Sequence, residues 1–167
     1  RLDYWHKGLD LVLKGFSYLP SKYKNKDVIL DLVGPDWLGG KNKIQDEIKK
    51  LNIKERVNFH GPLFGEKKYS LLRNASIFIL VSRNEGMPIS VLESMNEGTP
   101  TLISKETNIP IDALSKQACI FSDLNANSVA SGLNKLISDH DLRNDIALNA
   151  FKYAKKEFSY SNITKKY

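Results

Sequence analysis

The chain has 167 residues, of which 41% are hydrophobic and 26% charged; this composition is typical of one globular domain and excludes a disordered chain. The single cysteine, Cys119, excludes a disulfide framework and fits a reducing compartment, and the longest apolar run, residues 77–81, is too short to cross a bilayer. The 25 Lys and Arg exceed the 19 Asp and Glu, and the resulting net charge of +6 allows nucleic acid, an anionic membrane surface or a phosphorylated ligand as a partner.

The first half of the chain alternates between helical and strand patterns. Apolar residues spaced three and four positions apart predict helices with one buried face, and short apolar runs bounded by turn residues predict strands. In chain order we expect a helix over residues 9–19, a strand over 28–33, a helix over 44–51, a strand over 57–59, a helix over 69–75 and a strand over 77–81.

The second half continues this alternation. A helix is expected from Pro88 to Glu97, because Pro is well tolerated at the first helical position and Gly98 stands where a left-handed cap commonly ends a helix. Further along we expect strands over 99–104 and 118–121, helices over 129–137 and 142–150, and a charged, aromatic segment over 155–167 that could form a terminal helix.

Short buried strands, each followed by a helix, predict an α/β fold: a Rossmann-like parallel sheet with helices on both faces. We expect residues 1–167 to form a single domain, and a further strand upstream of Arg1, because the chain opens almost directly into a helix. In such folds ligands bind at the carboxyl ends of the strands. The loops that follow the expected strands, at residues 34–41, 60–66, 82–88 and 105–110, are therefore the candidate ligand-binding loops.

Several common catalytic and binding motifs are absent from the sequence. No G-x-G-x-x-G follows a strand and no G-x-S-x-G is present, so the dinucleotide fingerprint and the hydrolase nucleophile elbow are both missing. The three histidines lie far apart without partners at metal-ligand spacing, so we expect no metal site. Cys119 lies in an apolar stretch, where a buried, inert thiol is a better interpretation than a nucleophile.

Residues 83–93 carry most of the functional information. Glu85 follows a buried strand, Gly86 permits close approach of a ligand, and Glu93 lies in the helix that Pro88 begins. The backbone amides of Met87, Ile89 and Ser90 would be donors at a positive helix end, suited to a phosphate. The alternative is that Glu85 is only a helix-terminal charge and Glu93 a solvated residue, and the spacing alone leaves both interpretations open.

The E-x7-E spacing of Glu85 and Glu93, read with Glu85-Gly86-Met87-Pro88, resembles the signature of the family 4 retaining glycosyltransferases. Other segments match that family in the same order along the chain. Arg1 to Asp10 resembles the family's Gly-Arg…Lys-Gly-Leu-Asp opening, and residues 32–34 and 57–61 resemble the ends of its second and third strands. Residues 92–100 resemble its Leu-Glu-Ala-Met helix and the strand that follows, and residues 158–159 resemble a segment ahead of its last helix. Asn108 stands in place of the family's frequent Gly. The resemblance covers the whole chain, and only the combination of motifs is specific.

The resemblance implies the C-terminal, donor-binding half of a GT-B glycosyltransferase, whose N-terminal acceptor-binding domain is absent from this chain. By the family's pattern Arg1 and Lys7 would bind the diphosphate of a nucleotide-sugar without a metal or cofactor, Glu85 would contact the sugar and assist its transfer, and Glu93 would hold the ribose. Further substrate-binding positions implied by the pattern are Gly34, Pro62, Leu63, Gly86, Met87, Pro88, Ile89 and Ser90, with Pro62 and Leu63 against the base. For Arg1 and Lys7 the alternative is a frayed terminus and a helix-initial lysine.

The expected activity is retaining transfer of a hexose to a polysaccharide or glycolipid acceptor, in the cytoplasm. Two alternatives stay open: an epimerase or hydrolase of nucleotide-sugars with the same architecture, and a non-catalytic nucleotide-sugar-binding module. The lysines are spread along the whole chain, so peripheral contact with the inner face of a membrane remains open as well. No aromatic-plus-basic signature predicts nucleic acid binding. We expect the isolated 167-residue chain to be inactive, because half of the cleft is missing.

Overall fold

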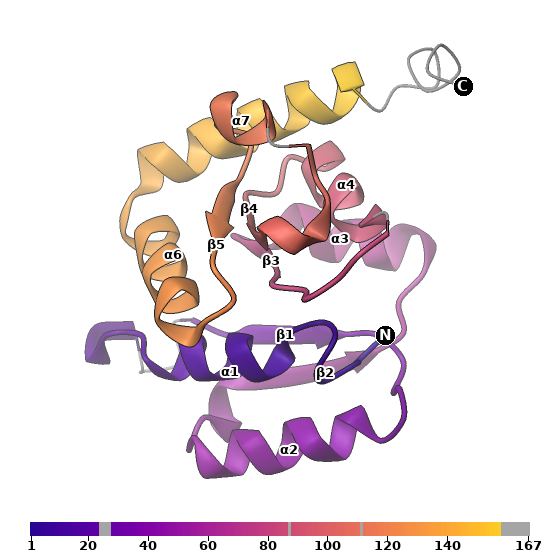
Figure 1. Ribbon diagram of the computed structural model, residues 1–167, viewed down its shortest axis with the longest axis vertical. Helices are drawn as coiled ribbons and strands as arrows, with labels where there is room; N and C mark the ends of the chain where they lie inside the picture. Colours follow the sequence, from indigo (N-terminus) through magenta and orange to yellow (C-terminus); the bar gives the residue numbers. More distant parts are fainter. Residues whose placement is uncertain (24–27, 87, 111, 158–167) are drawn as a thin grey trace.

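Helices and parallel strands alternate along the chain (Figure 1), as seen in a computed structural model that describes residues 1–23, 28–86, 88–110 and 112–157. The strands are β1 (Leu30–Val33), β2 (Val57–Gly61), β3 (Phe78–Leu80), β4 (Thr101–Ser104) and β5 (Ile120–Ser122). The helices are α1 (Leu9–Ser17), α2 (Gly40–Lys50), α3 (Gly65–Asn74), α4 (Ile89–Asn96), α5 (Asp112–Ser115), α6 (Ala126–Ser138) and α7 (His140–Glu157), with 3-10 turns η1 (Ser21–Tyr23), η2 (Lys54–Arg56) and η3 (Lys105–Thr107).

All strand pairings in the described part of the chain are parallel, as the sequence predicts, but the strands form two sheets. One sheet is the pair β1–β2, with Leu30 opposite Val57, and the other has the order β3–β4–β5. The N-terminal segment connects the two sheets. The Leu2 N–H donates to the Pro35 carbonyl at 2.7 Å beyond the end of β1, and the His6 carbonyl accepts from the Arg83 N–H at 2.8 Å beyond the end of β3.

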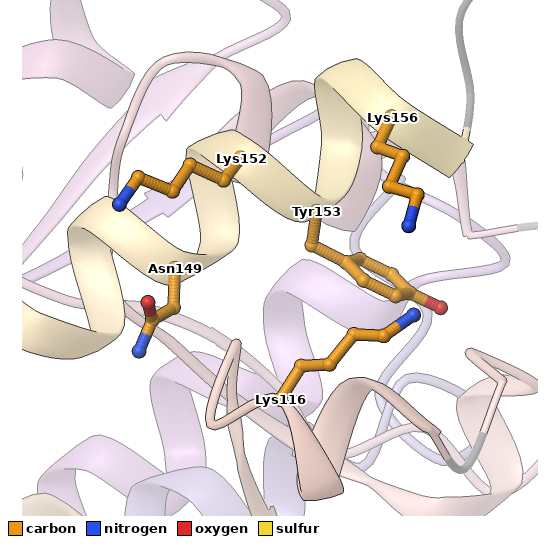
Figure 2. Close-up of a pocket in the computed structure, with 5 residues that line it drawn as sticks. All are labelled: Lys116, Asn149, Lys152, Tyr153 and Lys156. Atoms are coloured by element: carbon orange, nitrogen blue, oxygen red, sulfur yellow. The ribbon is translucent and has the colours of Figure 1, made fainter.

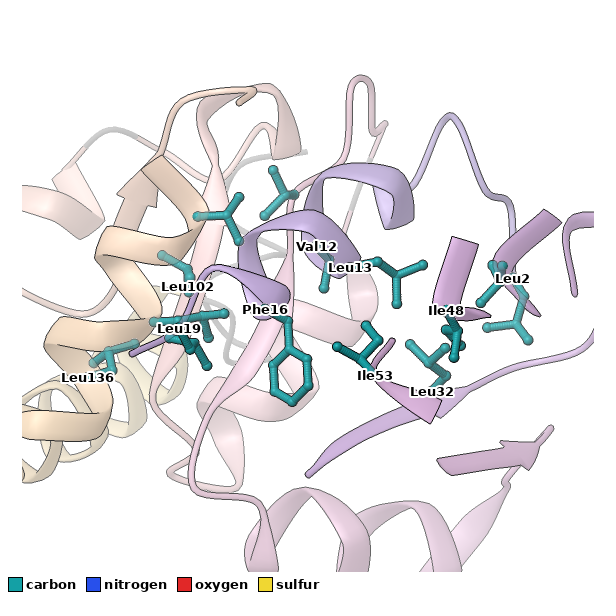
Figure 3. Close-up of a cluster of buried hydrophobic side chains, with 14 of the residues drawn as sticks. Leu2, Val12, Leu13, Phe16, Leu19, Leu32, Ile48, Ile53, Leu102 and Leu136 are labelled. Carbon is teal, nitrogen blue, oxygen red and sulfur yellow. The ribbon is translucent and has the colours of Figure 1, made fainter. Parts of the chain in front are cut away.

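Helices cover both faces of the β3–β4–β5 sheet, which confirms the predicted fold class. Adjacent residues of β4 show this directly, because side chains alternate between the two faces of a strand. Leu102 belongs to a core built with α1, α2 and α6 (Figure 3), whereas Ile103 belongs to a second core built with α4, α5 and α7. Accordingly, α1 packs against α6 and α2, and α4 packs against α7.

The end of α4 follows the predicted cap. Gly98 has φ +73° and its N–H donates to Met95 O at 3.0 Å, while the Thr99 N–H donates to Ser94 O at 2.9 Å. These two bonds form a Schellman motif, which satisfies the last carbonyls of the helix. The start differs by one residue, because α4 begins at Ile89 and Pro88 is its cap.

Other boundaries depart further from the sequence prediction. Helix α2 begins at Gly40 instead of residue 44, since Asp36 Oδ1 accepts the Lys41 N–H at 2.8 Å and secures a polar first turn that apolar spacing does not reveal. Residues 155–157 do not start a separate helix but continue α7, and the rest of that segment lies outside the described residues. Within the ranges given above, no helix is long and apolar enough to span a membrane.

Candidate functional site

The turn at Gly8 places Lys7 against the end of β3. Gly8 has φ +61°, and a Cβ atom there would lie 1.9 Å from the carbonyl oxygen of Val81. Only glycine tolerates both the left-handed conformation and this close approach. The Lys-Gly pair of the sequence therefore brings a lysine into contact with the loop that carries Glu85.

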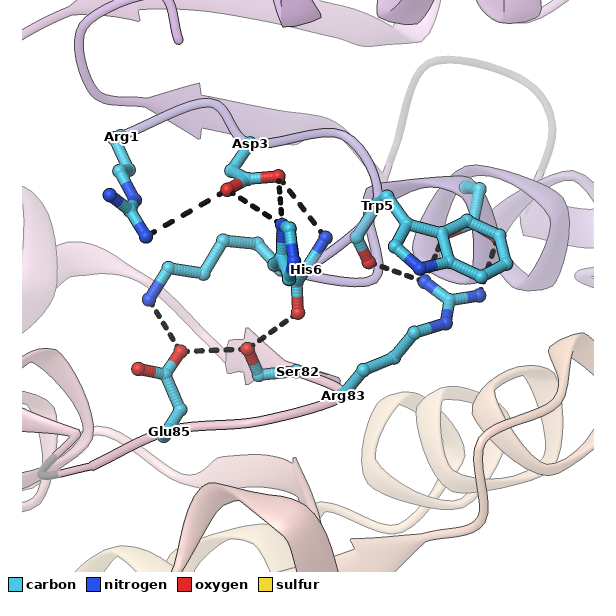
Figure 4. A network of polar contacts seen from close by, with 9 residues as sticks. Arg1, Asp3, Trp5, His6, Ser82, Arg83 and Glu85 are labelled. Carbon is cyan, nitrogen blue, oxygen red and sulfur yellow. Dashed lines mark hydrogen bonds and ion pairs between the residues drawn. The ribbon is translucent and has the colours of Figure 1, made fainter. Parts of the chain in front are cut away.

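Lys7 and Glu85 form an ion pair in which Lys7 Nζ donates to Glu85 Oε1. Ser82 Oγ lies 2.7 Å from the same carboxylate oxygen and 2.8 Å from the carbonyl of His6 (Figure 4). The side chains of Lys7 and Glu85 are only 23% and 11% exposed, so the pair is partly shielded from water and its charges act strongly on one another. The structure thus brings together two of the three residues predicted to act in catalysis.

Arg1, the third, lies at the same end of this network (Figure 4). Its guanidinium is 3.8 Å from Asp3 and stacks over the Trp37 ring, 4.4 Å from the centroid. Asp3 is buried and also accepts the His6 N–H at 3.1 Å. Burial alone would raise the pKa of Asp3, but the hydrogen bonds from His6 and the charges of His6 and Arg1 outweigh it and lower the pKa below its usual value.

Arg83 ties the loop before Glu85 to α1, a role that sequence reasoning missed. Its two terminal nitrogens each donate to a carboxylate oxygen of Asp10 at 2.8 Å, and its guanidinium lies 3.6 Å from the centroid of the Trp5 ring. This fork-to-fork geometry is among the stronger ionic contacts that proteins make. The available signal was that Arg83 lies in the stretch 83–93 that the sequence singles out, and Asp10 in the N-terminal segment that carries the family resemblance.

Glu93 belongs to a different ion pair. Lys68 Nζ, from α3, donates to Glu93 Oε1, from α4, at 2.5 Å. The hydrogen bond to Glu93 raises the pKa of Lys68. The sequence singled out Glu93 but not Lys68, because nothing in a linear pattern predicts which residue of α3 faces α4.

A pocket of about 210 Å³ opens at the carboxyl ends of β1 and β2. It brings together two residues of the predicted substrate-binding set, Gly34 and Pro62, and its other lining residues are Leu2, Pro35, Asp36, Lys41, Phe59 and Gly61. Leu63 follows Pro62 but is not part of the lining. His60, close by on β2, forms a hydrogen bond between its Nε2 and Asp31 Oδ1 at 2.7 Å.

The remaining predicted binding positions lie at the start of α4. Pro88 is buried, and its carbonyl accepts hydrogen bonds from the N–H groups of Val91 and Leu92. Gly86, Ile89 and Ser90 are exposed. Met87 lies outside the described residues. An exposed helix start of this kind presents backbone amides to an anion.

A second pocket, of about 160 Å³, lies between α7 and the residue that follows α5 (Figure 2). It is lined by Lys116, Asn149, Lys152, Tyr153 and Lys156. Lys116 and Tyr153 both donate to Asp112, at 2.6 and 2.8 Å. This pocket contains none of the residues predicted to bind substrate.

Cys119 lies in an apolar core and not in the described site. Cys119 is buried, and burial raises the pKa of its thiol to about 12, so the thiol is neutral at physiological pH. Within the described ranges, no group of three or more His, Cys, Asp or Glu side chains is placed to hold a metal ion. What the described site offers is an ion-paired lysine and carboxylate with an arginine at the same end of the network, a set suited to an anionic ligand that carries hydroxyl groups.

Comparison with known proteins gives consistent matches over nearly the whole chain. The family described as "Glycosyl transferases group 1" matches residues 1–153. Mannosylfructose-phosphate synthase of Agrobacterium fabrum is 23% identical over 164 residues, which cover 96% of this chain and 33% of that protein.

Solved structures show the same fold. Sucrose-phosphate synthase from Thermosynechococcus elongatus superimposes with a TM-score of 0.86 at 19% identity, over 99% of this chain and 41% of that one. Anabaena Alr3699/HepE, solved in complex with UDP and glucose, gives 0.81 at 20% identity, over 96% and 43%. The chain therefore spans less than half the length of these proteins.

Proposed function

The chain belongs to the glycosyl transferases group 1 family, and we propose that it forms the nucleotide-sugar-binding domain of a retaining glycosyltransferase of family 4. The donor is a hexose attached to a nucleoside diphosphate, and the acceptor, a polysaccharide or glycolipid, is bound mainly by an N-terminal domain of the same protein. The observation that carries this proposal is the partly buried ion pair between Lys7 and Glu85, with Arg1 at the same end of the network.

The pair marks the junction between the diphosphate and the sugar. When the bond between the anomeric carbon and the phosphate oxygen breaks, its electrons leave with the diphosphate, whose negative charge grows. Lys7 and Arg1 neutralise this charge, and the Glu85 carboxylate stabilises the positive charge that develops on the sugar. A cation and an anion held in contact before the donor arrives need little reorganisation to perform these two roles.

The other contacts extend outward from this junction. Glu93 accepts hydrogen bonds from the ribose hydroxyls in competition with Lys68, and the exposed amides at the start of α4, including Ile89 and Ser90, approach the phosphates. The pocket that contains Gly34 and Pro62 takes the base. Support for this class of donor comes from HepE, which shares the fold and was solved with UDP and glucose.

Calorimetry with UDP, GDP and their hexose derivatives tests the proposal. Replacing Lys7 with Ala removes a charge-assisted contact, and we expect affinity for the nucleoside diphosphate to fall about 10-fold to 100-fold; Glu93→Ala should weaken binding as well. Lys14→Ala is the matched control, because Lys14 lies only seven residues further along the chain, on α1, but is 44% exposed and 3.9 Å from Glu47. Unchanged affinity in both Lys7→Ala and Glu93→Ala would overturn the proposal.

Product analysis on the complete protein separates transfer from the other reactions of nucleotide-sugars. A glycosyltransferase releases the nucleoside diphosphate in proportion to the sugar found on the acceptor, and the product keeps the anomeric configuration of the donor if the reaction is retaining. Free sugar without acceptor modification would indicate a hydrolase, and a changed sugar still attached to the nucleotide an epimerase.

A further inference from the structure

Glu85 is held through its backbone as well as through its carboxylate. Its N–H donates to the carbonyl of Glu106 at 3.1 Å, and its own carbonyl accepts a hydrogen bond from the side-chain amide Nδ2 of Asn108. Both bonds come from the short turn η3 and the residue after it. Glu85 itself lies in an irregular loop between β3 and α4, so these bonds help to define where its backbone sits.

The turn that supplies these bonds is firmly anchored. Ser104, at the end of β4, donates from Oγ to the carbonyl of Ser82 at 2.5 Å, and Thr107 donates from Oγ1 to the carbonyl of Ser104 at 2.6 Å. Ser82, Ser104 and Thr107 are all fully buried. Hydrogen bonds made in such an environment stay closed more of the time than exposed ones, so Asn108 projects from a fixed base.

The backbone of Asn108 is in the left-handed region, with φ +57° and ψ 24°. Glycine adopts this conformation at the lowest cost, and asparagine is one of the few other residues that enter it readily. Asparagine here therefore fits the turn and adds what glycine lacks, an amide group that reaches the carbonyl of Glu85.

We propose that Asn108 is a positioning residue for Glu85. Its amide restrains one side of the Glu85 backbone while Lys7 and Ser82 restrain the carboxylate, so that the carboxylate stays directed at the sugar. The consequence for sugar binding rests on the function proposed above, but the restraint of the loop does not.

Hydrogen exchange at the Glu85 amide tests the restraint alone. In the complete protein we expect Asn108→Gly, which keeps the turn conformation, and Asn108→Asp, which keeps the side-chain shape but loses the N–H donor, to accelerate this exchange about fivefold, the factor expected for one net hydrogen bond. The matched control is Asn52→Gly, since Asn52 is exposed after α2 and has φ +54°. Exchange that is equal in the wild type and both Asn108 variants would overturn the inference.

Calorimetry with UDP and UDP-glucose, repeated with GDP and GDP-mannose, tests the consequence. One of the two nucleotides, UDP or GDP, should bind, and the affinity of Asn108→Gly for it should stay within about twofold of the wild type. Affinity for the corresponding nucleotide-sugar should fall by up to about fivefold. An equal loss for both ligands, or none for the sugar derivative, contradicts a role in directing Glu85. Accelerated exchange in a protein whose wild type binds none of the four ligands supports the restraint and overturns the proposed function instead.

Discussion

Lys7 and Glu85 are 78 positions apart in the chain, yet their side chains are in direct contact at the end of β3. The contact depends on the N-terminal segment, which runs past the ends of both sheets, and on the glycine that turns the chain after Lys7. Removing one member of a partly buried ion pair leaves the charge of the other without a neutralising partner. Lys7 and Glu85 therefore stabilise each other's charge before any ligand is present.

Glu93 should act on the ribose and not on the phosphates. We expect Glu93→Gln to lower affinity for UDP or GDP about threefold to tenfold, because a carboxylate is a better acceptor for hydroxyl groups than an amide, and to leave affinity for inorganic pyrophosphate unchanged. Lys68→Met is the companion variant: it frees Glu93 from its ion pair and should raise nucleotide affinity up to about fivefold. Competition binding with pyrophosphate and the nucleotide measures both effects, and equal losses for the two ligands in Glu93→Gln would contradict this assignment.

Gly8 should be essential for the stability of the site. Gly8→Ala places a Cβ atom 1.9 Å from the carbonyl oxygen of Val81, and we expect a loss of more than about 3 kcal/mol in the free energy of unfolding. Gly39→Ala provides the control, since Gly39 also has a positive φ, of +71°, but has open space around its Cβ position; this change should cost only about 1 kcal/mol. Denaturant unfolding compares the two, and similar losses would show that the close approach to Val81 is not the cause.

The Cys119 thiol should be unreactive in the folded protein. Burial raises its pKa from 9.0 to about 12, so thiolate is scarce at pH 8 and iodoacetamide should alkylate the folded protein at least about 100-fold more slowly than the protein unfolded in guanidinium. Mass spectrometry of alkylated samples gives the alkylation rates, and equal rates in the folded and the unfolded protein would contradict the burial of Cys119.

The raised pKa of Cys119 also affects stability at high pH. The stabilising contribution of the neutral thiol is complete below about pH 9 and declines as the pH rises toward 12.

The 167-residue chain by itself should bind donor without transferring sugar. The chain covers less than half of the related proteins, and we propose that the acceptor contacts come from outside it. Assays with UDP-glucose and GDP-mannose, with and without extracted glycolipid, should give no transfer above a Lys7→Ala control. Sustained turnover by the chain alone would contradict the proposal that the acceptor contacts come from outside it.

The elements could largely be predicted from the sequence because their signals are local. Apolar runs marked the five strands to within a few residues, and helical spacing marked α1, α6 and most of α7. The polar first turn of α2 was not predicted, because the cap from Asp36 depends on a contact and not on periodicity. The short helix α5 was missed as well, since four residues are too few to show a period.

The sequence by itself determined the fold class, the family resemblance and the choice of Arg1, Lys7, Glu85 and Glu93 as candidates, because strand and helix periods and motif spacing are properties of neighbouring residues. Only the tertiary structure decided that Lys7 contacts Glu85, that Lys68 contacts Glu93 and that Arg83 is fixed by Asp10. Each of these contacts joins residues 25 to 78 positions apart. Such contacts exist only after the helices have packed on the sheets and set which side chains face one another, and no local pattern records that outcome.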